Sequence, residues 1–165
     1  MTRRDWLALL SGFGLGGSAA AQPAAPGAAG NARKVEPLVL TAAQWKQRLT
    51  PAQYHVLREE GTEPAGSSPL NDEKRKGTFH CAGCELALFS SETKYESGTG
   101  WPSFYDVLPG AVATKRDFKL ILPRTEYHCA RCGGHQGHIF DDGPKPTGLR
   151  YCNNGVALKF VLGFA

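Results

Sequence analysis

The five cysteines of this 165-residue chain fall into two groups with different chemical uses. Four form two Cys-x-x-Cys pairs, Cys81 with Cys84 and Cys129 with Cys132, and Cys152 stands alone near the end. A Cys-x-x-Cys turn presents two thiolates to one cation, and two such turns complete the tetrahedral sulfur shell that zinc prefers. The pattern therefore predicts one structural zinc ion and a single working thiol.

The two pairs lie in segments that match beyond their cysteines. Residues 79–84 read Phe-His-Cys-Ala-Gly-Cys and residues 127–132 read Tyr-His-Cys-Ala-Arg-Cys, so two copies of one turn are expected to face each other. Two redox dithiols or two local disulfides are the alternative, although neither pair lies in the strand-to-helix context of a thioredoxin. His80 and His128 are interpreted as neighbours of the metal site and not as ligands.

Cys152 lies in the segment Arg-Tyr-Cys-Asn-Asn, residues 150–154. If residues 150–162 form one strand, alternation puts Arg150, Cys152 and Asn154 on one face. A nearby guanidinium favours the thiolate, which is the reactive form of cysteine. A lone cysteine is also often a small buried core residue, so this segment alone leaves both interpretations open.

Two histidines three positions apart follow the second cysteine pair. His135 and His138 lie in a segment that continues to Asp142, and histidine is the natural proton donor near neutral pH. They are also candidate zinc ligands, but the four paired cysteines already fill a tetrahedral shell. A role in proton transfer is therefore favoured.

A glycine-rich segment, residues 97–104, carries two aromatic side chains, Trp101 and Phe104. Aromatic faces on a turn can hold an apolar methyl or thioether group, which makes both residues candidate walls of a substrate pocket. Core packing is the alternative, and it is stronger for Phe104 than for Trp101.

Two short helices are predicted to precede the strands. Thr41 and Gln44 form a capping-box pattern, and Thr50 before Pro51, with Gly61 beyond, marks a second helix. From Gly77 onward, short runs such as 118–122 and 156–162 are rich in aromatic and branched residues and are typical of strands. The expected fold class is mainly β: antiparallel sheets stapled by the four-cysteine zinc site, with two short N-terminal helices that pack through Trp45, Leu49, Tyr54 and Leu57.

The first residues have the layout of an export signal. Arg3 and Arg4 precede a short apolar stretch that ends in three alanines, which predicts a twin-arginine-type signal peptide over residues 1–21 and a periplasmic protein. An unstructured cytosolic leader or an uncleaved anchor is the alternative. Residues 22–34 are rich in Ala, Pro and Gly and are expected to be a disordered linker, which leaves residues 35–165 as one domain without stable membrane association.

The charge balance argues against a nucleic-acid partner. Removal of residues 1–21 takes two of 19 basic and one of 15 acidic side chains, which leaves 17 and 14 and a formal charge of +3. Such a weak excess does not provide the basic surface that nucleic-acid binding requires.

Together these motifs resemble the B-type methionine sulfoxide reductases. The resemblance rests on Gly-Thr-Gly-Trp-Pro-Ser-Phe, the two Cys-x-x-Cys turns, Gly-His-x-Gly-His-x-Phe-Asp-Asp-Gly-Pro and Arg-Tyr-Cys-x-Asn, in the family's order, over residues 41–160. It implies an oxidoreductase that repairs oxidised methionine in proteins or peptides by reducing the R epimer of its sulfoxide.

The resemblance also implies roles for individual residues. Cys152 would be the nucleophile that becomes a sulfenic acid, and His138, assisted by His135, would protonate the substrate oxygen. The remaining implied roles are these: Arg150 and Asn154 position and tune the thiolate, Asp142 holds the histidine region, and Trp101 and Phe104 wall the methyl pocket.

The chain departs from the family pattern at Thr99. Many members have a cysteine there, which resolves the sulfenic acid by forming a disulfide. With the other four cysteines committed to zinc, Cys152 is expected to be reduced by an external thiol, either a thioredoxin-like protein or a small thiol. The competing functions are a zinc-stapled binding module, which would not need Cys152, and a thiol peroxidase, which would not need an aromatic pocket.

Overall fold

Two threonines begin the two helices of the computed structural model, which describes residues 35–119 and 123–163. The side chains of Thr41 and Thr50 accept the backbone N–H groups of Gln44 and Gln53, so both helices start with a complete capping box. Helix α1 spans Ala42–Arg48 and α2 spans Pro51–Glu59. Both predicted helices are therefore confirmed, and the expected signal peptide of residues 1–21 and linker of residues 22–34 lie outside the described residues.

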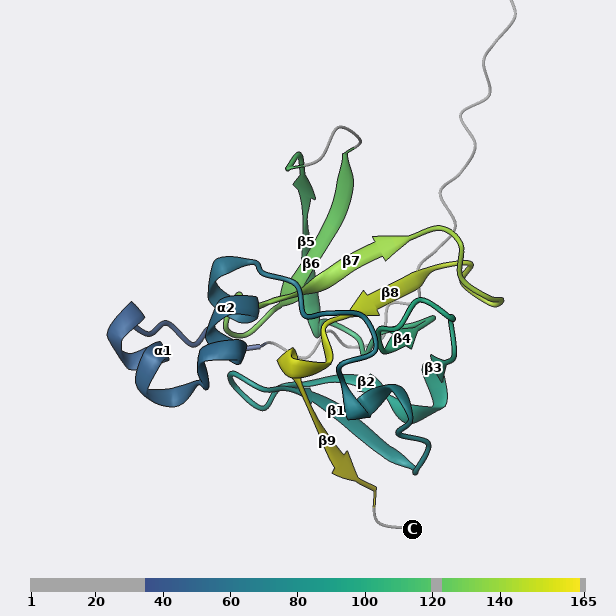
Figure 1. Cartoon of the computed structure of the whole chain (residues 1–165), viewed down its shortest axis with the longest axis horizontal. Coiled ribbons are helices and arrows are strands. Elements are labelled where there is room, and N and C mark those ends of the chain that lie inside the picture. The colour runs from purple at the N-terminus through teal and green to yellow at the C-terminus, as the bar shows by residue number, and fades with distance from the viewer. Residues whose placement is uncertain (1–34, 120–122, 164–165) are drawn as a thin grey trace, which may run out of the picture.

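Nine short strands form two antiparallel sheets in the described part of the chain (Figure 1). The smaller sheet has the order β2-β1-β9 and the larger sheet has the order β3-β4-β8-β7-β6-β5. Their bounds are β1 Gly77–Cys81, β2 Ala87–Ser90, β3 Lys94–Tyr95, β4 Ser103–Phe104, β5 Val112–Asp117, β6 Arg124–Cys129, β7 His135–Phe140, β8 Arg150–Asn153 and β9 Leu158–Leu162. Three 3-10 turns complete the fold, namely η1 Pro69–Asn71, η2 Ser91–Thr93 and η3 Gly155–Ala157. The expected fold class is confirmed.

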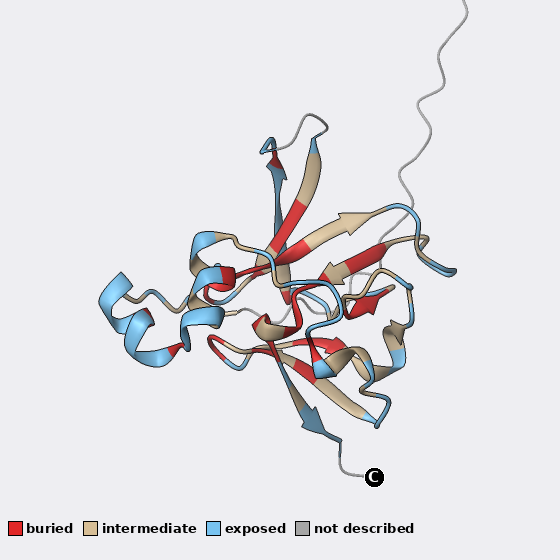
Figure 2. Cartoon of the chain, viewed as in Figure 1, coloured by how far each residue is buried: buried red, intermediate tan, exposed pale blue. Residues whose placement is uncertain are grey.

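An aromatic core lies between the two sheets. Phe89 and Phe104 stack with ring centroids 4.1 Å apart, and Phe79 meets Phe104 edge-on at 5.0 Å. Tyr127 and Tyr151 close the same cluster from the larger sheet. Figure 2 shows the buried residues on these inner strands, whereas much of the two helices, most of β5 and the far end of β9 are exposed. Burial of several aromatic side chains fixes the sheets against each other.

Two predicted strands differ from the observed ones. The run 118–122 was expected to be a strand, but β5 ends at Asp117, Phe118 is 72 % exposed beyond it, and residues 120–122 lie outside the described residues. The run 150–162 divides into β8 and β9, because η3 turns the chain from the larger sheet into the smaller one. Within the described ranges, no helix has the length and apolar character needed to cross a membrane.

Candidate active site and metal centre

The two Cys-x-x-Cys turns have the same backbone structure. Cys81 ends β1 and Cys129 ends β6, and the carbonyl oxygen of each accepts the N–H of the residue four positions later, at 2.8 Å in both turns. Those later residues, Glu85 and Gly133, both have a left-handed backbone, with φ of +62° and +66°. Glycine adopts this conformation without strain and glutamate does so at a cost, so the shared shape is a property of the turn.

The four sulfur atoms of these turns form one buried cluster. All four Sγ atoms lie within 4.8 Å of one another, with 3.4 Å between Cys84 and Cys129 and 3.7 Å between Cys81 and Cys132. A tetrahedral zinc with Zn–S near 2.3 Å places its sulfurs about 3.8 Å apart. The cysteines are free thiols, since a disulfide requires about 2.05 Å. The cluster can therefore hold one metal ion, and its donor set is consistent with structural zinc.

Crowding makes the four thiols unequal in acidity. Hydrogen bonding with Cys129 raises the pKa of Cys81 and lowers the pKa of Cys132. Four thiolates this close repel one another strongly unless a cation lies between them. In the described part of the chain, the four cysteines are the group of side chains arranged to hold a metal, and neither His80 nor His128 belongs to it.

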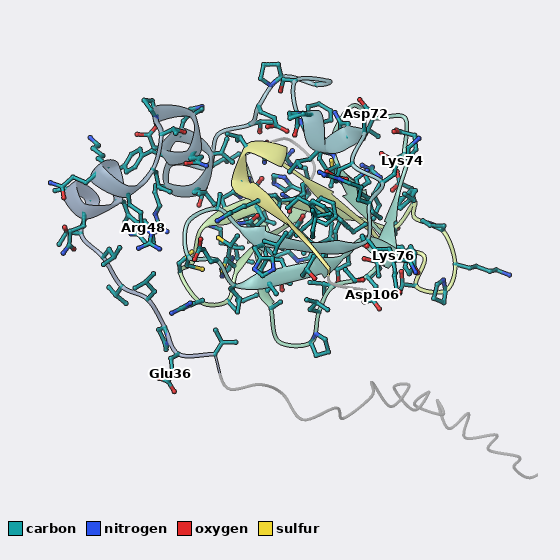
Figure 3. The ribbon with its side chains drawn as sticks, turned by 90° about the horizontal axis from the view of Figure 1, so that it is seen from below. Glu36, Arg48, Asp72, Lys74, Lys76 and Asp106 are labelled. Carbon is teal, nitrogen blue, oxygen red and sulfur yellow. The ribbon has the colours of Figure 1, made fainter. Side chains whose placement is uncertain are left out.

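Arginine side chains tie the helices to this cluster. Arg48 Nε donates to the carbonyl oxygen of Gly83 at 2.8 Å, and Arg58 Nη1 donates to that of Cys132 at 2.9 Å. Figure 3 shows Arg48 at the helical end of the molecule, far from the labelled Asp72 and Lys74. The helices thus pack against the turns that carry the four cysteines.

Cys152 belongs to a row of side chains that crosses the larger sheet. The cross-strand partners run Ser103, Cys152, His138, Glu126 and Lys115, from β4 through β8, β7 and β6 to β5. Residues directly opposite in an antiparallel sheet point to the same face, with Cβ atoms about 5 Å apart. The sheet register therefore places the lone thiol directly beside His138.

A β-bulge brings His135 to the same face as His138. Residues three apart on a regular strand point to opposite faces, but β7 carries one extra residue, Gln136, opposite the step from Tyr127 to His128. The Gln136 side chain points into the core, where its Nε2 lies 3.4 Å from Cys81 Sγ. The two histidine rings meet edge-on with centroids 5.5 Å apart. Both histidines were predicted as site residues from the sequence, and the bulge places their side chains on the same face of the sheet.

Each histidine contacts a buried carboxylate. Glu126 Oε1 lies 2.8 Å from His135 Nδ1, and Asp117 Oδ2 lies 2.8 Å from His138 Nε2. Burial lowers the pKa of His138, and the hydrogen bond that its ring donates to Asp117 opposes that change. Hydrogen bonding to the Lys119 backbone N–H lowers the pKa of Asp117, so this carboxylate stays ionised. His135 Nε2 is buried and has no hydrogen-bond partner among the described residues.

The surroundings of Cys152 push its acidity in both directions. Burial raises the pKa of the thiol, while the charge of Arg150 and hydrogen bonds from Thr99 and Arg150 oppose that rise. The guanidinium thus acts in the predicted direction, toward the thiolate, while burial acts against it.

Asp142 contacts Arg150 and not a histidine. Its two carboxylate oxygens accept hydrogen bonds from Arg150 Nε and Nη2 at 2.7 and 2.9 Å, and the guanidinium lies 4.3 Å from the centre of the Phe140 ring. The expected contact of Asp142 with the histidine region is therefore replaced by a bidentate pair that fixes Arg150. The role assigned to Asp142 changes from holding histidines to holding the cation beside Cys152.

A hollow of about 140 Å³ opens above this group. Trp101, His138, Phe140 and Cys152 line it, and Trp101 Nε1 donates to the carbonyl oxygen of Glu63 at 3.1 Å. The indole is thus held in place with its ring at the pocket. The structure places one thiol, one histidine and two aromatic rings around a space suited to a small side-chain group.

Phe104 does not line this hollow. Its side chain is fully buried and stacks on Phe89, because Phe104 pairs with Tyr151 on the core face of the sheet. Its prediction as a pocket wall is therefore wrong, and the alternative of core packing is confirmed. Phe140, on the same face as Cys152, provides the second aromatic wall instead.

Asn154 lies one residue beyond β8 rather than on its face. Its Nδ2 donates to the carbonyl oxygen of Gln136 at 3.0 Å, and its Oδ1 accepts the N–H of Glu63 at 3.0 Å. It therefore joins β7, the end of β8 and the segment that carries Glu63. The neighbouring Gly137 must lack a side chain, since a Cβ there would lie 1.9 Å from the carbonyl oxygen of Cys152.

Several residues of this site were not predicted from the sequence. Glu126 and Asp117 were missed because their contacts depend on strand register, which no local motif reveals. Arg124, whose Nη2 donates to Asp117 Oδ2 at 2.7 Å, was missed for the same reason. Phe140 lies inside a motif that was recognised, and strand alternation from His138 could have placed it at the pocket.

Comparison with known proteins agrees with this arrangement. The family model described as SelR domain matches residues 49–162. A protein of Leptospira interrogans serogroup Icterohaemorrhagiae serovar Lai (strain 56601) named peptide methionine sulfoxide reductase MsrB is 56 % identical over 117 residues, which cover 70 % of this chain and 89 % of the relative. A protein of the same name from Methanosarcina barkeri (strain Fusaro / DSM 804) is 56 % identical over 118 residues, covering 71 % and 83 %.

The chain is also similar to a plant protein whose name places it in the chloroplast. Peptide methionine sulfoxide reductase B1, chloroplastic, from Arabidopsis thaliana is 49 % identical over 129 residues, which cover 78 % of this chain and 64 % of that protein. The matched region contains both cysteine turns, the histidine-bearing strand and Cys152. This chain belongs to the SelR-domain family.

Proposed function

We propose that this protein reduces the R epimer of methionine sulfoxide in peptides and proteins, with Cys152 as nucleophile. Methionine sulfoxide reduction is the activity that the names of its relatives give. The observation that carries the proposal is the cross-strand pair of Cys152 and His138 at a small pocket walled by Trp101 and Phe140. A methyl thioether group fits such aromatic walls, and the thiol and histidine face its sulfur and oxygen.

The first step transfers one oxygen atom to the enzyme. Cys152 gives its proton to the histidine pair, and the resulting thiolate attacks the sulfoxide sulfur. His138 then protonates the departing oxygen, with His135 held beside it by Glu126. The hydroxyl then passes from the substrate sulfur to the Cys152 sulfur as the sulfur–sulfur bond of the adduct breaks, so methionine leaves and Cys152 becomes a sulfenic acid. The thiol hydrogen ends on the transferred oxygen, and the sulfoxide is reduced by two electrons.

The second step regenerates the thiol with an external reductant. A thiol attacks the sulfenic acid and releases water, and a second thiol breaks the resulting mixed disulfide. Thr99 contacts Cys152 where a resolving cysteine would act, and its hydroxyl cannot form a disulfide. A thioredoxin-like protein or a small thiol therefore supplies the electrons.

The proposed metal is zinc, held by Cys81, Cys84, Cys129 and Cys132. The sulfur-only donor set, the separations of 3.4 and 3.7 Å and the complete burial of Cys81 and Cys129 favour it. Zinc would bind the ends of β1 and β6 together and would take no part in the oxygen transfer.

The site of action is proposed to be the periplasm. Arg3 and Arg4, the apolar stretch after them and the three alanines before Gln22 support export by a twin-arginine route. That route carries folded proteins, so four metal-bound thiolates would be protected before they meet an oxidising compartment. Fractionation of cells that express the full chain tests this, and replacement of Arg3 and Arg4 by Lys should retain the protein in the cytoplasm.

Single-turnover assays with separated epimers test the activity. Purified protein without added reductant should convert about one equivalent of a peptide R-sulfoxide to methionine and leave the S epimer unchanged. Cys152→Ser should yield no methionine while it retains metal and fold. If neither epimer reacts with metal-loaded protein, the enzyme proposal fails in favour of a binding module.

A further inference from the structure

A groove larger than the catalytic pocket lies beside it. This groove has a volume of about 570 Å³, compared with about 140 Å³ for the pocket that contains Cys152. Its apolar lining comes from α2, the loop before η1, η1, η3 and the start of β9, through Val56, Pro64, Pro69, Leu70, Val156 and Leu158. The oxygen-transfer chemistry described above uses none of these side chains.

The groove and the pocket share a wall that is two chain segments thick. Thr62 lines both spaces, Glu63 lines the groove, Asn154 lines the pocket and Gly155 lines the groove. Hydrogen bonds join the two segments: Asn154 Oδ1 accepts the N–H of Glu63 at 3.0 Å, and Glu63 Oε1 accepts the N–H of Gly155 at 2.6 Å. The groove and the catalytic pocket are therefore neighbours, separated by a wall that these hydrogen bonds hold in place.

Five polar side chains that line the groove already have hydrogen-bond partners within the chain. They are Gln53, His55, Glu63, Ser67 and Ser68. The Glu63 carboxylate in particular accepts the N–H groups of Gly155 and Val156. An apolar group entering the groove therefore buries hydrocarbon and leaves the hydrogen bonds of these atoms in place.

We propose that this groove binds an apolar side chain of the substrate polypeptide, two residues away from the oxidised methionine. Side chains two residues apart in an extended peptide point the same way with Cβ atoms about 6.7 Å apart, and the length of both side chains lets their ends reach the hollows on either side of the two-segment wall. Methionine is mainly a core residue, so its neighbours in a damaged protein are often apolar and become exposed with it. This inference rests on the proposed function and specifies its substrate as unfolded apolar segments.

The test compares blocked five-residue peptides that carry a central methionine R-sulfoxide, with the full-length protein and saturating dithiothreitol. Leu replaces Ser at the second position before or after the sulfoxide, and a blocked single-residue R-sulfoxide serves as reference. One of the two Leu peptides should have a kcat/KM about tenfold above the Ser peptide, the effect of partly burying one leucine. The other Leu peptide should resemble the Ser peptide.

Substitutions in the groove identify where the preference arises. Val156→Thr keeps the shape but adds a hydroxyl, and Leu70→Gln is a second probe should the first fail to fold. Either should reduce the Leu-over-Ser ratio to about threefold or less. The matched Val161→Thr, on the exposed side of β9, should keep the wild-type ratio.

Three outcomes overturn the inference. If the single-residue reference and all peptides react equally well, the reductase proposal stands and the groove has no part in substrate binding. If the Leu-over-Ser ratio of kcat/KM falls as the protein concentration rises, a second copy of the chain occupies the groove in place of the substrate. If no R-sulfoxide reacts at all, the proposed function itself fails.

Discussion

The four-cysteine cluster and the site around Cys152 place the same kind of side chain, a cysteine thiol, in two different environments. In the four-cysteine cluster, the sulfurs face one another within 4.8 Å and the thiols are buried, with 8 % exposure at most. Cys152 is only partly buried and faces His138, Arg150 and Thr99 instead of other thiols. Under the proposed function, the neighbours of each cysteine, more than its burial, separate the metal-binding thiols from the reacting one.

The sites also differ in how the backbone builds them. The cluster is made from two local turns with identical hydrogen bonds, each encoded by a few consecutive residues. The reactive site is made from one residue on each of several strands, aligned by sheet register and by the bulge at Gln136. Substitutions in the cluster should therefore act on folding, and those around Cys152 should act on rate.

Cys84→Ser should have the largest effect on stability. Loss of one ligand from a buried four-thiolate site removes metal binding and lowers the free energy of unfolding by on the order of 5 kcal/mol, a large part of a domain's stability. Metal content and thermal unfolding measure this. The same exchange at Cys152 is the matched control and should preserve both. A Cys84→Ser protein with unchanged metal content and unfolding temperature would contradict the clamp role.

His138→Asn should reduce kcat/KM by about 100- to 1,000-fold, because the proton donor for the substrate oxygen is lost. Metal content should stay the same, since His138 belongs to the Cys152 site and not to the four-cysteine cluster. His80→Asn serves as control, because His80 bonds a carbonyl oxygen of its own turn and faces no substrate. Equal losses in the two variants would show that the effect is structural.

Much of the cluster could be predicted from the sequence, because a repeated Cys-x-x-Cys turn is a local signal. Cys152, His138 and Trp101 could also be identified, since each lies in a short recognisable motif. Glu126 and Asp117 could not, because their contacts with the histidines arise only when β5, β6 and β7 are in register. Phe104 was misassigned, because two nearby aromatic positions of one motif lie on opposite sides of the larger sheet.

Thr99→Cys should give the Cys152 site one feature of the four-cysteine cluster, namely a second thiol within bonding distance of the first. Substrate oxidation should then produce a disulfide between the introduced cysteine and Cys152, and the lifetime of the sulfenic acid at low external thiol should fall about 100-fold. Mass spectrometry under non-reducing conditions detects the bond. Thr99→Ser is the control and should form none. Absence of the disulfide in the cysteine variant would mean that Thr99 does not face the oxidised sulfur.

Arg150→Met should have a smaller effect, visible in the pH dependence of the first turnover. With Cys152 as thiolate and His138 protonated in the reactive form, the rate rises with pH through the lowered pKa of His138, stays level, and falls through the raised pKa of Cys152. Loss of the cation raises the pKa of Cys152 further. The plateau should drop about tenfold and its alkaline limit should move to higher pH.

Arg150→Lys separates charge from shape in that experiment. Lysine keeps the positive charge but loses the bidentate pair with Asp142, so the alkaline limit should move less than in the methionine variant. Identical profiles for wild type and Arg150→Met would show that the guanidinium does not act on the thiol.

The most direct test of the division between the two sulfur sites follows a labelled oxygen atom. One equivalent of peptide methionine R-sulfoxide carrying heavy oxygen is mixed with metal-loaded protein, the sulfenic acid is trapped, and metal release is measured alongside peptide mapping. We expect the heavy oxygen on Cys152, one methionine per chain and full retention of the metal. Label on Cys81, Cys84, Cys129 or Cys132, or metal released in step with methionine formation, would contradict the account.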